Sequence, residues 1–563
     1  MNIHLPRKLR QFAFGLSIIA VLAAAPFALA ELPSPEKEAE SLFVHGIKPD
    51  DAGLAVLVAQ NGKILFEKGY GLADLEHHQA VTPESKFRIG SITKQFTAAA
   101  ILKLQEEGKL SVQDKLSKYI PDFPRGEEVT LHHLLTHTSG IHSFTSKPDF
   151  MQQVTNAITT EALIKSFQND PFDFEPGAKW LYDNSGYVLL GYIVEKVSGK
   201  TYATFLRENF FQPLGMTNTG VYRSDLALTH EAIGYGYKDG KFDRAVDWNM
   251  SWAGGAGALY STVEDLFRWN EGLFNGKVLS EASLKAAFTP VKTKENQNDD
   301  SGTGYGYGWV IAELRGLKEI WHNGGLNGFS STLLRLPTAN FTVAILANSE
   351  PGKPEVVPGD LARKLIELYL GDKLAPVPAA NADVSPKAFD ALAGRYDLGG
   401  PILTVTKEGD HLFAQLSGQA KLEIFPKSET EFFWKVVEAQ ITFVKDKDGK
   451  VVKAVQKQNG LTLDAPRLKD LVEAKIDPAA YDSLLGKYDY GQGQATMTVT
   501  REGEHLFAQL SGQAKYEIFP KSETEFFWKV VDAQITFVKD EKGKVTKAIH
   551  HQGGRSFDAP KLE

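Results

Sequence analysis

The first strongly patterned region of the chain consists of two apolar runs separated by a turn signal. Residues 54–60 read Leu-Ala-Val-Leu-Val-Ala-Gln and are followed by Asn61-Gly62 and a second run, Lys-Ile-Leu-Phe-Glu-Lys. Asn-Gly favours a two-residue hairpin turn, because both residues tolerate a positive φ. The pattern therefore predicts an antiparallel hairpin at the start of the folded region.

After Ser91 the spacing of the apolar residues becomes helical. The run up to Gly108 is rich in alanine, which predicts a largely buried helix that ends at this glycine. Further helices are expected at 131–135, 187–197 and 262–274, the last with Ser261 and Glu264 as a capping box, and strands at 309–314, 330–336 and 341–347. Strands at both ends with helices between them predict an α/β (α+β) domain, in which the first and last strands of a sheet are neighbours.

The last third of the chain repeats itself. Residues 408–446 and 502–540 differ at only three of 39 positions, and both copies alternate apolar and polar residues in short runs between glycine turns. Residues 375–386, rich in Ala and Pro, are expected to form a linker. The sequence thus predicts a large domain at 31–378 and two small all-β domains, each a lipocalin-like barrel or a sandwich, at 386–472 and 476–563.

Residues 1–30 have the features of a signal peptide. Arg7, Lys8 and Arg10 precede an apolar run, and the segment ends on the small-residue pattern Ala-Leu-Ala. We therefore expect a periplasmic or secreted protein with no membrane span after cleavage. The alternative is an uncleaved N-terminal anchor, for which the apolar run is short.

The composition argues against several classes of function. Lys and Arg number 62 and Asp and Glu 70, a net charge of −8 without a basic block, so nucleic acid and anionic membrane surfaces are not expected partners. The absence of cysteine excludes disulfides and a thiol nucleophile. No nucleotide-binding loop or G-x-S-x-G turn is present, and we expect no cofactor. Three histidines, His132, His133 and His137, lack carboxylates at metal-site spacing, so packing is expected rather than a metal.

The candidate chemistry starts at Ser91, which forms an S-x-x-K pattern with Lys94 at the start of the predicted helix. This spacing places the hydroxyl and the amine on one helical face, and a lysine whose pKa is lowered by burial can activate a serine. The pattern alone is weak, since Ser34 and Lys37 also match it in a charged segment. Ser91 differs because two further motifs follow it at wide spacing.

Those motifs are Tyr182-x-Asn184 and His322-x-Gly324. Taken alone, a tyrosine before an apolar helix is usually a packing residue, and H-x-G recurs by chance at His551-x-Gly553 in the repeat. Together with S-x-x-K, and with Leu-Leu-Thr-His-Thr-Ser-Gly at 134–140, they make the chain resemble the superfamily of class C β-lactamases and penicillin-binding proteins, in the branch of D-aminopeptidases and related esterases. The resemblance covers roughly residues 52–348 and implies a β-lactamase-like catalytic domain with an antiparallel sheet flanked by helices.

The resemblance also implies an acyl-enzyme mechanism. Ser91 would attack a carbonyl, with Lys94 and Tyr182 sharing the base and acid roles. Asn184 would hydrogen-bond Lys94 and the substrate amide. The backbone N–H groups of Ser91 and Gly325 would form the oxyanion hole.

The third motif sets the expected specificity. Gly324 and Gly325 leave room for a substrate to approach the strand that carries them. His322 replaces the lysine of the K-T-G motif, so a permanent charge that would hold a substrate carboxylate gives way to a group that titrates near pH 6.5. This departure argues against β-lactam hydrolysis and carboxypeptidase action. Asp183 stands where relatives often carry serine, and the sequence reveals no effect of that difference.

We expect an exported serine hydrolase with a small-molecule or peptide substrate, acting as a peptidase or amidase on D-residue-containing peptides or amides. A carboxylesterase or a β-lactamase on the same site is the alternative. A different class of protein also fits the motifs: a penicillin-binding sensor that is acylated without turnover, or a scaffold in which the repeats act. The sequence predicts no oligomeric state.

Overall fold

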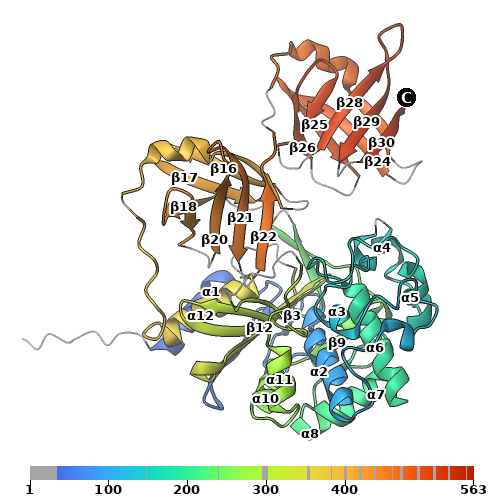
Figure 1. The fold of residues 1–563 in the computed structure, drawn as a ribbon, viewed down its shortest axis with the longest axis vertical. Helices are drawn as coiled ribbons and strands as arrows, with labels where there is room; N and C mark the ends of the chain where they lie inside the picture. Colours follow the sequence, from blue (N-terminus) through green and yellow to red (C-terminus); the bar gives the residue numbers. More distant parts are fainter. Residues whose placement is uncertain are drawn as a thin grey trace, which may run out of the picture.

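The computed structural model describes residues 34–562 with gaps, and these residues form one large domain and two small β domains (Figure 1). The gaps are residues 148, 239, 295–301, 351–355, 382, 399–401, 417–420, 436–438, 459–460, 470–472, 491–494, 512–514, 530–532 and 553–554. The predicted signal peptide lies outside the described residues.

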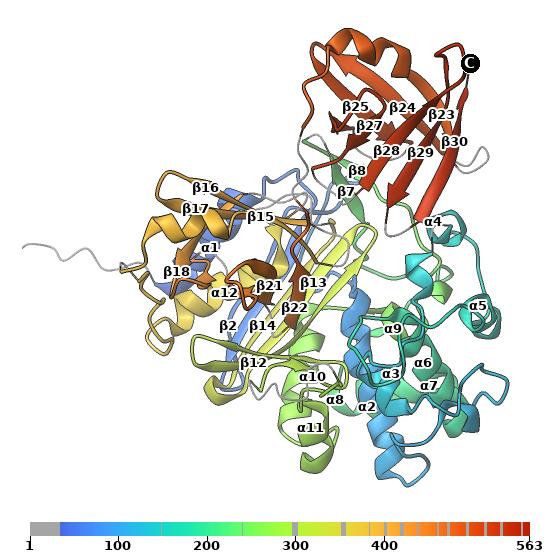
Figure 2. The ribbon, with the colours of Figure 1, turned by 45° about the horizontal axis from the view of Figure 1, so that its top comes forward.

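A seven-stranded antiparallel sheet forms the centre of the large domain, in the order β10-β11-β12-β13-β14-β1-β2 (Figure 2). Its strands are β1 (Leu54–Gln60), β2 (Lys63–Tyr70), β10 (Gly304–Tyr305), β11 (Val310–Leu314), β12 (Leu317–Leu326), β13 (Phe329–Leu336) and β14 (Phe341–Ala347). Asn61 and Gly62 have φ angles of 53° and 75°, which confirms the predicted hairpin turn. β1 pairs with β14 from Leu54 opposite Ala347 onward, so the first and last strands are neighbours as predicted.

Helices cover both faces of this sheet, which explains why β1 is buried at six of its seven residues. Alternate residues of β1 face opposite cores: Val56 packs with Phe43 of α1 and Leu365 of α12, and Leu57 packs in the core that holds α2 and α10. The helices are α1 (Pro35–Gly46), α2 (Thr93–Glu106), α3 (Leu131–Leu135), α4 (Phe150–Gln153), α5 (Thr160–Phe167), α6 (Asn184–Ser198), α7 (Tyr202–Leu206), α8 (Gln212–Leu214), α9 (Gly254–Gly257), α10 (Val263–Phe274), α11 (Glu281–Ala287) and α12 (Pro358–Leu370).

Seven short strands of the described residues complete the large domain in three small sheets. They are β3 (Leu72–Asp74) with β4 (Gln79–Ala80), β5 (Phe87–Arg88), β9 (Leu259–Ser261) and β6 (Gly220–Val221) in that order, and β7 (Tyr235–Lys238) with β8 (Lys241–Arg244). The sheet that contains β5 matters for function, because β5 leads directly into Ser91.

Two local predictions differ from the structure. Helix α10 is capped by Thr262, whose hydroxyl accepts a hydrogen bond from the N–H of Asp265, and not by the expected box of Ser261 and Glu264. Strand β12 is present in the structure but was not predicted, because charged residues and Gly324 interrupt the alternation of apolar residues along it.

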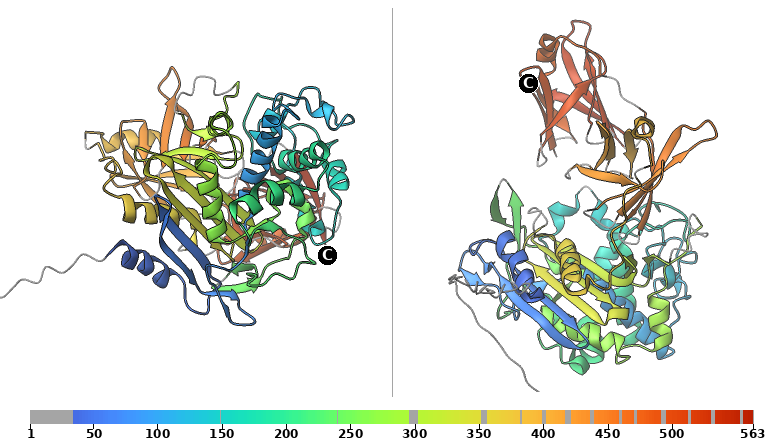
Figure 3. Two further views of the ribbon diagram at one scale, coloured as in Figure 1. Left: turned by 90° about the horizontal axis from the view of Figure 1, so that it is seen from below. Right: turned by 90° about the vertical axis from the view of Figure 1, so that its left-hand side faces the viewer.

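The repeats form two antiparallel β units, which stand on the same side of the large domain (Figure 3). The first runs β15 (Gly394–Asp397), β16 (Ile402–Glu408), β17 (His411–Leu416), β18 (Leu422–Pro426), β19 (Glu431–Phe433), β20 (Ala439–Lys445), β21 (Val451–Gln458) and β22 (Leu461–Pro466). The second runs β23 (Gly486–Tyr490), β24 (Ala495–Glu502), β25 (His505–Leu510), β26 (Tyr516–Pro520), β27 (Glu525–Phe527), β28 (Ala533–Lys539), β29 (Val545–Gln552) and β30 (Arg555–Leu562).

The second unit is a closed barrel, since β23 pairs with β30. The first has the same strand order, and a single bridge between Tyr396 and Arg467 joins its ends. Each unit has its own core, with Phe432 and Phe526 as fully buried equivalents. These units confirm the prediction of two small all-β, barrel-like domains. Strand β22 of the first unit also contacts β10 of the large domain.

A buried asparagine joins the sheet to strand β3 and to the segment around Ile233, and it offers a test of this fold. Asn348 is fully buried directly after β14, where Nδ2 donates to the carbonyls of Leu72 (3.1 Å), Ala73 (3.0 Å) and Ile233 (2.8 Å), and Oδ1 accepts from Gly53 N–H (2.7 Å). Asn348→Ala removes the hydrogen bonds of both side-chain N–H groups and of Oδ1, and should destabilise the large domain by about 2–4 kcal/mol.

Scanning calorimetry of the full chain measures this effect. Only the transition of the large domain should move to lower temperature, because the barrels have separate cores. Asn275→Ala, at an exposed helix end, is the control and should change stability by less than about 0.5 kcal/mol. Equal transitions for the two variants would contradict the assigned role of Asn348.

Candidate active site

Ser91 lies in a tight turn that leads into helix α2. The turn, Gly90–Ile92, is a 3-10 segment continuous with α2, and Nζ of Lys94 lies 3.2 Å from Oγ of Ser91. Lys94 is fully buried, and its Nζ donates further hydrogen bonds to Oδ1 of Asn184 (2.8 Å) and to the carbonyl of Ala256 (2.9 Å). Three acceptors from three separate parts of the chain therefore hold the amine beside the hydroxyl.

Burial alters the acid–base properties of both candidate bases. Loss of solvent lowers the pKa of Lys94 to about 7, although attraction to Asp183 opposes this shift. Burial raises the pKa of Tyr182 above its usual value, and a hydrogen bond with Ser91 opposes that rise. The amine is therefore the group that becomes a free base near neutral pH.

Tyr182 and Asn184 reach Lys94 from the start of helix α6. Asp183 between them is the N-cap of this helix, with its carboxylate accepting from the N–H of Gly186. The ring centre of Tyr182 lies 4.7 Å from Nζ of Lys94, and the amide of Asn184 also donates to Oγ1 of Thr145 at 3.0 Å. Capping by the central residue thus positions its two neighbours around the amine.

Strand β12 approaches the Ser91 turn so closely that glycine is required. A Cβ on Gly90 would lie 2.8 Å from the nitrogen of Gly325, and one on Gly324 would lie 1.9 Å from the carbonyl oxygen of Ile89. A Cβ on Gly325 would meet no atom within 4 Å. Open space for a substrate therefore lies beside Gly325, whereas Gly324 serves the packing of the strand against the turn.

The same end of β12 has an unpaired edge. The pairing of β11 with β12 ends at Val310 opposite Trp321, so in the described part of the chain residues 322–326 pair only with β13. An extended substrate can add to such an edge as a further strand, with its backbone hydrogen-bonded to the protein.

His322 is buried and neutral. Its Nδ1 lies 2.5 Å from the carbonyl oxygen of Asn323, so this nitrogen carries the proton and donates. Its Nε2 accepts from the hydroxyl of Tyr305 at 2.9 Å. Burial and the nearby charge of Lys94 lower the pKa of His322 to about 3. The third motif therefore brings no positive charge to the site.

A cavity of about 400 Å³ opens between Ser91 and helix α12. Ser91, Tyr182 and His322 form its polar end, and Asn323, Gly324 and Gly325 line the side along β12. None of the described residues that line it is acidic or permanently cationic. The rest of the wall is mainly apolar, with Trp180, Tyr305, Val310, Trp321, Val357 and Pro358, and it also includes Gly359 and the two serines Ser330 and Ser331.

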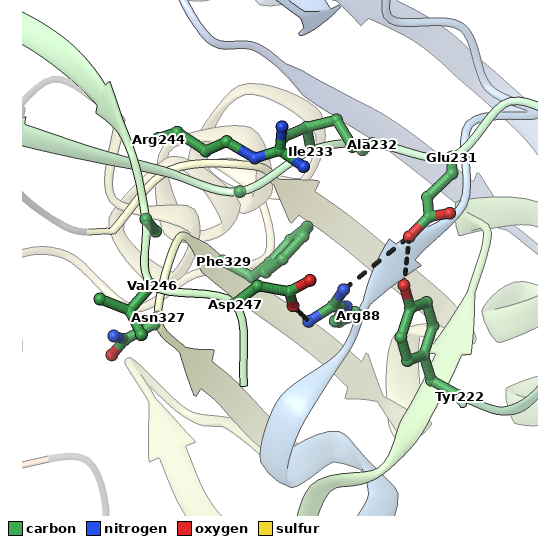
Figure 4. Close-up of a pocket in the computed structure, with 12 residues that line it drawn as sticks. Arg88, Tyr222, Glu231, Ala232, Ile233, Arg244, Val246, Asp247, Asn327 and Phe329 are labelled. Atoms are coloured by element: carbon green, nitrogen blue, oxygen red, sulfur yellow. Dashed lines mark hydrogen bonds and ion pairs between the residues drawn. The ribbon is translucent and has the colours of Figure 1, made fainter. Parts of the chain in front are cut away.

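A smaller, polar cavity of about 140 Å³ lies next to the turn that follows β12, where Asn327 and Phe329 line it (Figure 4). Arg88, three residues before Ser91, donates to Asp247 at 2.6 Å and lies 3.9 Å from Glu231. Its guanidinium also stacks 3.9 Å from the ring centre of Tyr222. Two carboxylates and a ring thus anchor the strand that leads into the Ser91 turn.

Several residues at the site were not found by motif. Trp180 and Tyr305 line the cavity, and His137, fully buried, packs 4.4 Å from the ring of Tyr182 and accepts from the N–H of Asp183. His137 lies in the segment 134–140, which contributes to the family resemblance, and that segment was the sequence signal that could have identified it. Trp180 and Tyr305 have no local pattern that distinguishes them from packing residues.

The other sequence candidates have structural roles. Ser34 is the N-cap position of α1, remote in sequence from any site motif. His132 lies 2.8 Å from the hydroxyl of Tyr307, and His133 completes a capping box with Thr130. Among the described residues no helix has the length and apolar composition needed to cross a membrane.

Comparisons with known proteins agree with this geometry. The family described as Beta-lactamase matches residues 44–367, and the family described as Domain of unknown function (DUF3471) matches residues 379–467 and 471–560. Penicillin-binding protein 4* of Bacillus subtilis is 32% identical over 422 residues, which cover 70% of this chain and 90% of the relative.

Two solved structures show the same fold. The octameric penicillin-binding protein homologue from Pyrococcus abyssi has a TM-score of 0.53 and 27% identity, covering 76% of this chain and 99% of that one. The D-stereospecific amidohydrolase from Streptomyces sp. has a TM-score of 0.50 and 25% identity, covering 60% and 99%. Two DUF3471 domains follow the β-lactamase domain along the chain. Since the family match spans more than half of the sequence and contains the Ser91 turn, the chain belongs to the β-lactamase family of serine hydrolases.

Proposed function

We propose that this chain is an exported hydrolase that cleaves D-residue-containing peptides or amides through an acyl-enzyme on Ser91. The observation that carries the proposal is the 3.2 Å contact between the buried amine of Lys94 and the hydroxyl of Ser91, next to a cavity with an open strand edge. A serine hydroxyl is a weak nucleophile without an adjacent base, and this amine is such a base.

The reaction divides into two steps. In the first, Oγ of Ser91 bonds to the substrate carbonyl carbon while its proton passes to Lys94, with Tyr182 as the second carrier. Collapse of the tetrahedral intermediate breaks the C–N bond, and the proton moves to the leaving nitrogen. In the second, water attacks the acyl-enzyme and the same groups return the proton to Ser91. The N–H groups of Ser91 and Gly325 would stabilise the oxyanion in both steps.

The walls of the cavity favour neutral substrates near His322. A carboxylate there would lose its hydration without gaining a cation, because His322 is neutral and the described lining has no Lys or Arg. Trp180 and Trp321 instead offer apolar contact area. This chemistry supports an amidase or aminopeptidase type of substrate and argues against carboxypeptidase action.

The relatives support the substrate class. One structural relative is named as a D-stereospecific amidohydrolase, and the curated relative is named as a penicillin-binding protein. Export is supported by the charged and apolar pattern of residues 1–30.

A carboxylesterase is the second candidate. The same apolar, uncharged cavity accepts an alcohol leaving group as readily as an amine, and esters need less activation than amides. A β-lactamase or a sensor acylated without turnover would use the same serine, but both act on ligands that carry a carboxylate.

One prediction of this function concerns the nucleophile. Ser91→Ala should lower kcat/KM for D-aminoacyl anilides and p-nitrophenyl esters by about 10⁴-fold or more, because no acyl-enzyme can form. Ser34→Ala, in the other S-x-x-K match, is the control and should keep full activity and full labelling by a fluorophosphonate. Normal turnover by Ser91→Ala would refute the assignment, and labelling without turnover in the wild type would favour the sensor.

Another prediction of the proposed function concerns charge on the leaving group. For a matched pair of D-aminoacyl-D-alanine and its C-terminal amide, kcat/KM should favour the neutral amide by about tenfold or more, equivalent to about 1.4 kcal/mol of desolvation cost. The pair differs only in the charged group, so each compound controls for the other. A preference for the free carboxylate would contradict the proposed specificity.

A further inference from the structure

The orientation of the Asn184 side chain matters to the base, and shape alone cannot fix it. The oxygen and the nitrogen of a carboxamide are almost equal in size, so only hydrogen bonds decide which of them faces a neighbour. Oδ1 of Asn184 accepts from Nζ of Lys94 at 2.8 Å. With Nδ2 in that place, the ammonium of Lys94 would meet a donor instead of an acceptor. The base therefore depends on a carboxamide that is held in the correct orientation.

Thr145 binds the other end of this carboxamide. Nδ2 of Asn184 donates to Oγ1 of Thr145 at 3.0 Å, and no other described residue accepts from this nitrogen. From Oδ1 of the same side chain the hydrogen bonds continue to Lys94 and then to Ser91, at 2.8 and 3.2 Å. An unbroken chain of hydrogen bonds thus joins the Thr145 hydroxyl to the nucleophile.

The backbone around Thr145 is fixed independently of its hydroxyl. Thr145 lies in the short 3-10 segment Phe144–Ser146, in which the side chain of Phe144 is buried in the core. The N–H of Phe144 donates to Oγ of Ser185 at 2.9 Å, and this hydroxyl donates to the carbonyl of His142 at 2.8 Å. Loss of the Thr145 hydroxyl should therefore leave this segment attached to the start of α6.

We propose that Thr145 is a positioning residue, which holds the carboxamide of Asn184 so that Oδ1 accepts from Lys94 and one N–H remains for the substrate. A carboxamide nitrogen has two N–H groups, so the group that Thr145 does not bind is left for a substrate carbonyl. Thr145 acts through Asn184 and need not touch the substrate. The inference rests on the proposed function, because it concerns the base that activates Ser91.

The effect on the base follows from the three acceptors around the ammonium of Lys94, which are Oγ of Ser91, Oδ1 of Asn184 and the carbonyl of Ala256. Thr145→Val leaves a methyl group beside Nδ2, so the carboxamide can turn away from the amine. Loss of an acceptor destabilises the ammonium more than the neutral amine, which needs fewer acceptors. Lys94 should then lose its proton at lower pH. Since kcat/KM rises as the base deprotonates, its acidic limb should also move to lower pH.

The other titratable groups around Lys94 are unchanged in such a variant. They come from the start of α6, from the segment after α3 and from β12, and they are Tyr182, Asp183, Tyr187, His137 and His322. A difference between variants at position 145 therefore reports on the hydrogen bonds of the carboxamide.

Thr145→Val tests the proposal because it removes the hydroxyl and nearly keeps the shape of the side chain. We expect kcat/KM at its optimum to fall about tenfold and its acidic limb to move down by about 0.5–1 pH unit. The rate of fluorophosphonate labelling of Ser91 should show the same shift, and this rate does not depend on the identity of the substrate. Thr145→Ser keeps a hydroxyl and should restore both values. Thr145→Ala should behave as Thr145→Val and serves if the latter is poorly folded.

Ser185→Ala is the matched control, because it weakens the same junction between loop and helix without removing a partner of the carboxamide. Its Tm should fall, whereas its acidic limb should overlay that of the wild type. An unmoved limb in the folded variants without the Thr145 hydroxyl, or an equal shift in Thr145→Ser or Ser185→Ala, would overturn the proposal. Failure of the proposed function would appear instead as activity in Ser91→Ala, so the two results are separable.

Discussion

The burial of one amine is the constraint on which the rest of the catalytic domain depends. A charged lysine in a dry interior is unstable by several kcal/mol unless hydrogen bonds and a counter-charge compensate it. Lys94 obtains these from Asn184 on α6, from the carbonyl of Ala256 in α9, and from the field of Asp183. Helices α2, α6 and α9 must meet at one point to supply them, and the Ser91 hydroxyl lies at that point.

The site also requires that strand β12 lies directly against the Ser91 turn. Gly90 and Gly324 remove the side chains that would keep β12 away from the Ser91 turn, and Arg88 fixes the strand that precedes it. Lys94 and Asp183 are then enclosed with two histidines, His137 and His322, whose pKa values are lowered by burial. Because His322 adds no charge, the cavity presents a neutral, largely apolar surface to whatever binds next to Ser91.

The site motifs and most of the fold could be predicted from the sequence, because each depends on local signals. Asn61-Gly62 specifies a turn by backbone conformation, and Ser91 and Lys94 share a helical face by spacing. The contributions of Tyr305 and of Asp183 could not be predicted in this way. Tyr305 meets His322 only because β10 and β12 lie on either side of β11, and the cap residue Asp183 places Asn184 against Lys94 only through the packing of α6 on α2.

The two repeats show how nearly identical sequences come to differ in structure at one end. Their shared segment gives the same buried positions, such as Phe432 and Phe526. Around the end of β29, however, the second copy has an aromatic cluster in which Tyr490 and Phe557 surround His550, with 2.5 Å between the hydroxyl of Tyr490 and Nδ1.

In the first copy the corresponding residues are Leu398, Gln456 and Leu463, and the strand that carries Leu463, β22, contacts β10 beside the active site. A core tolerates little change because every volume is matched by its neighbours, whereas the end of a barrel meets surroundings that differ between the copies. The two copies therefore share one core and differ in sequence around the strand end at which the first copy contacts the large domain through β10.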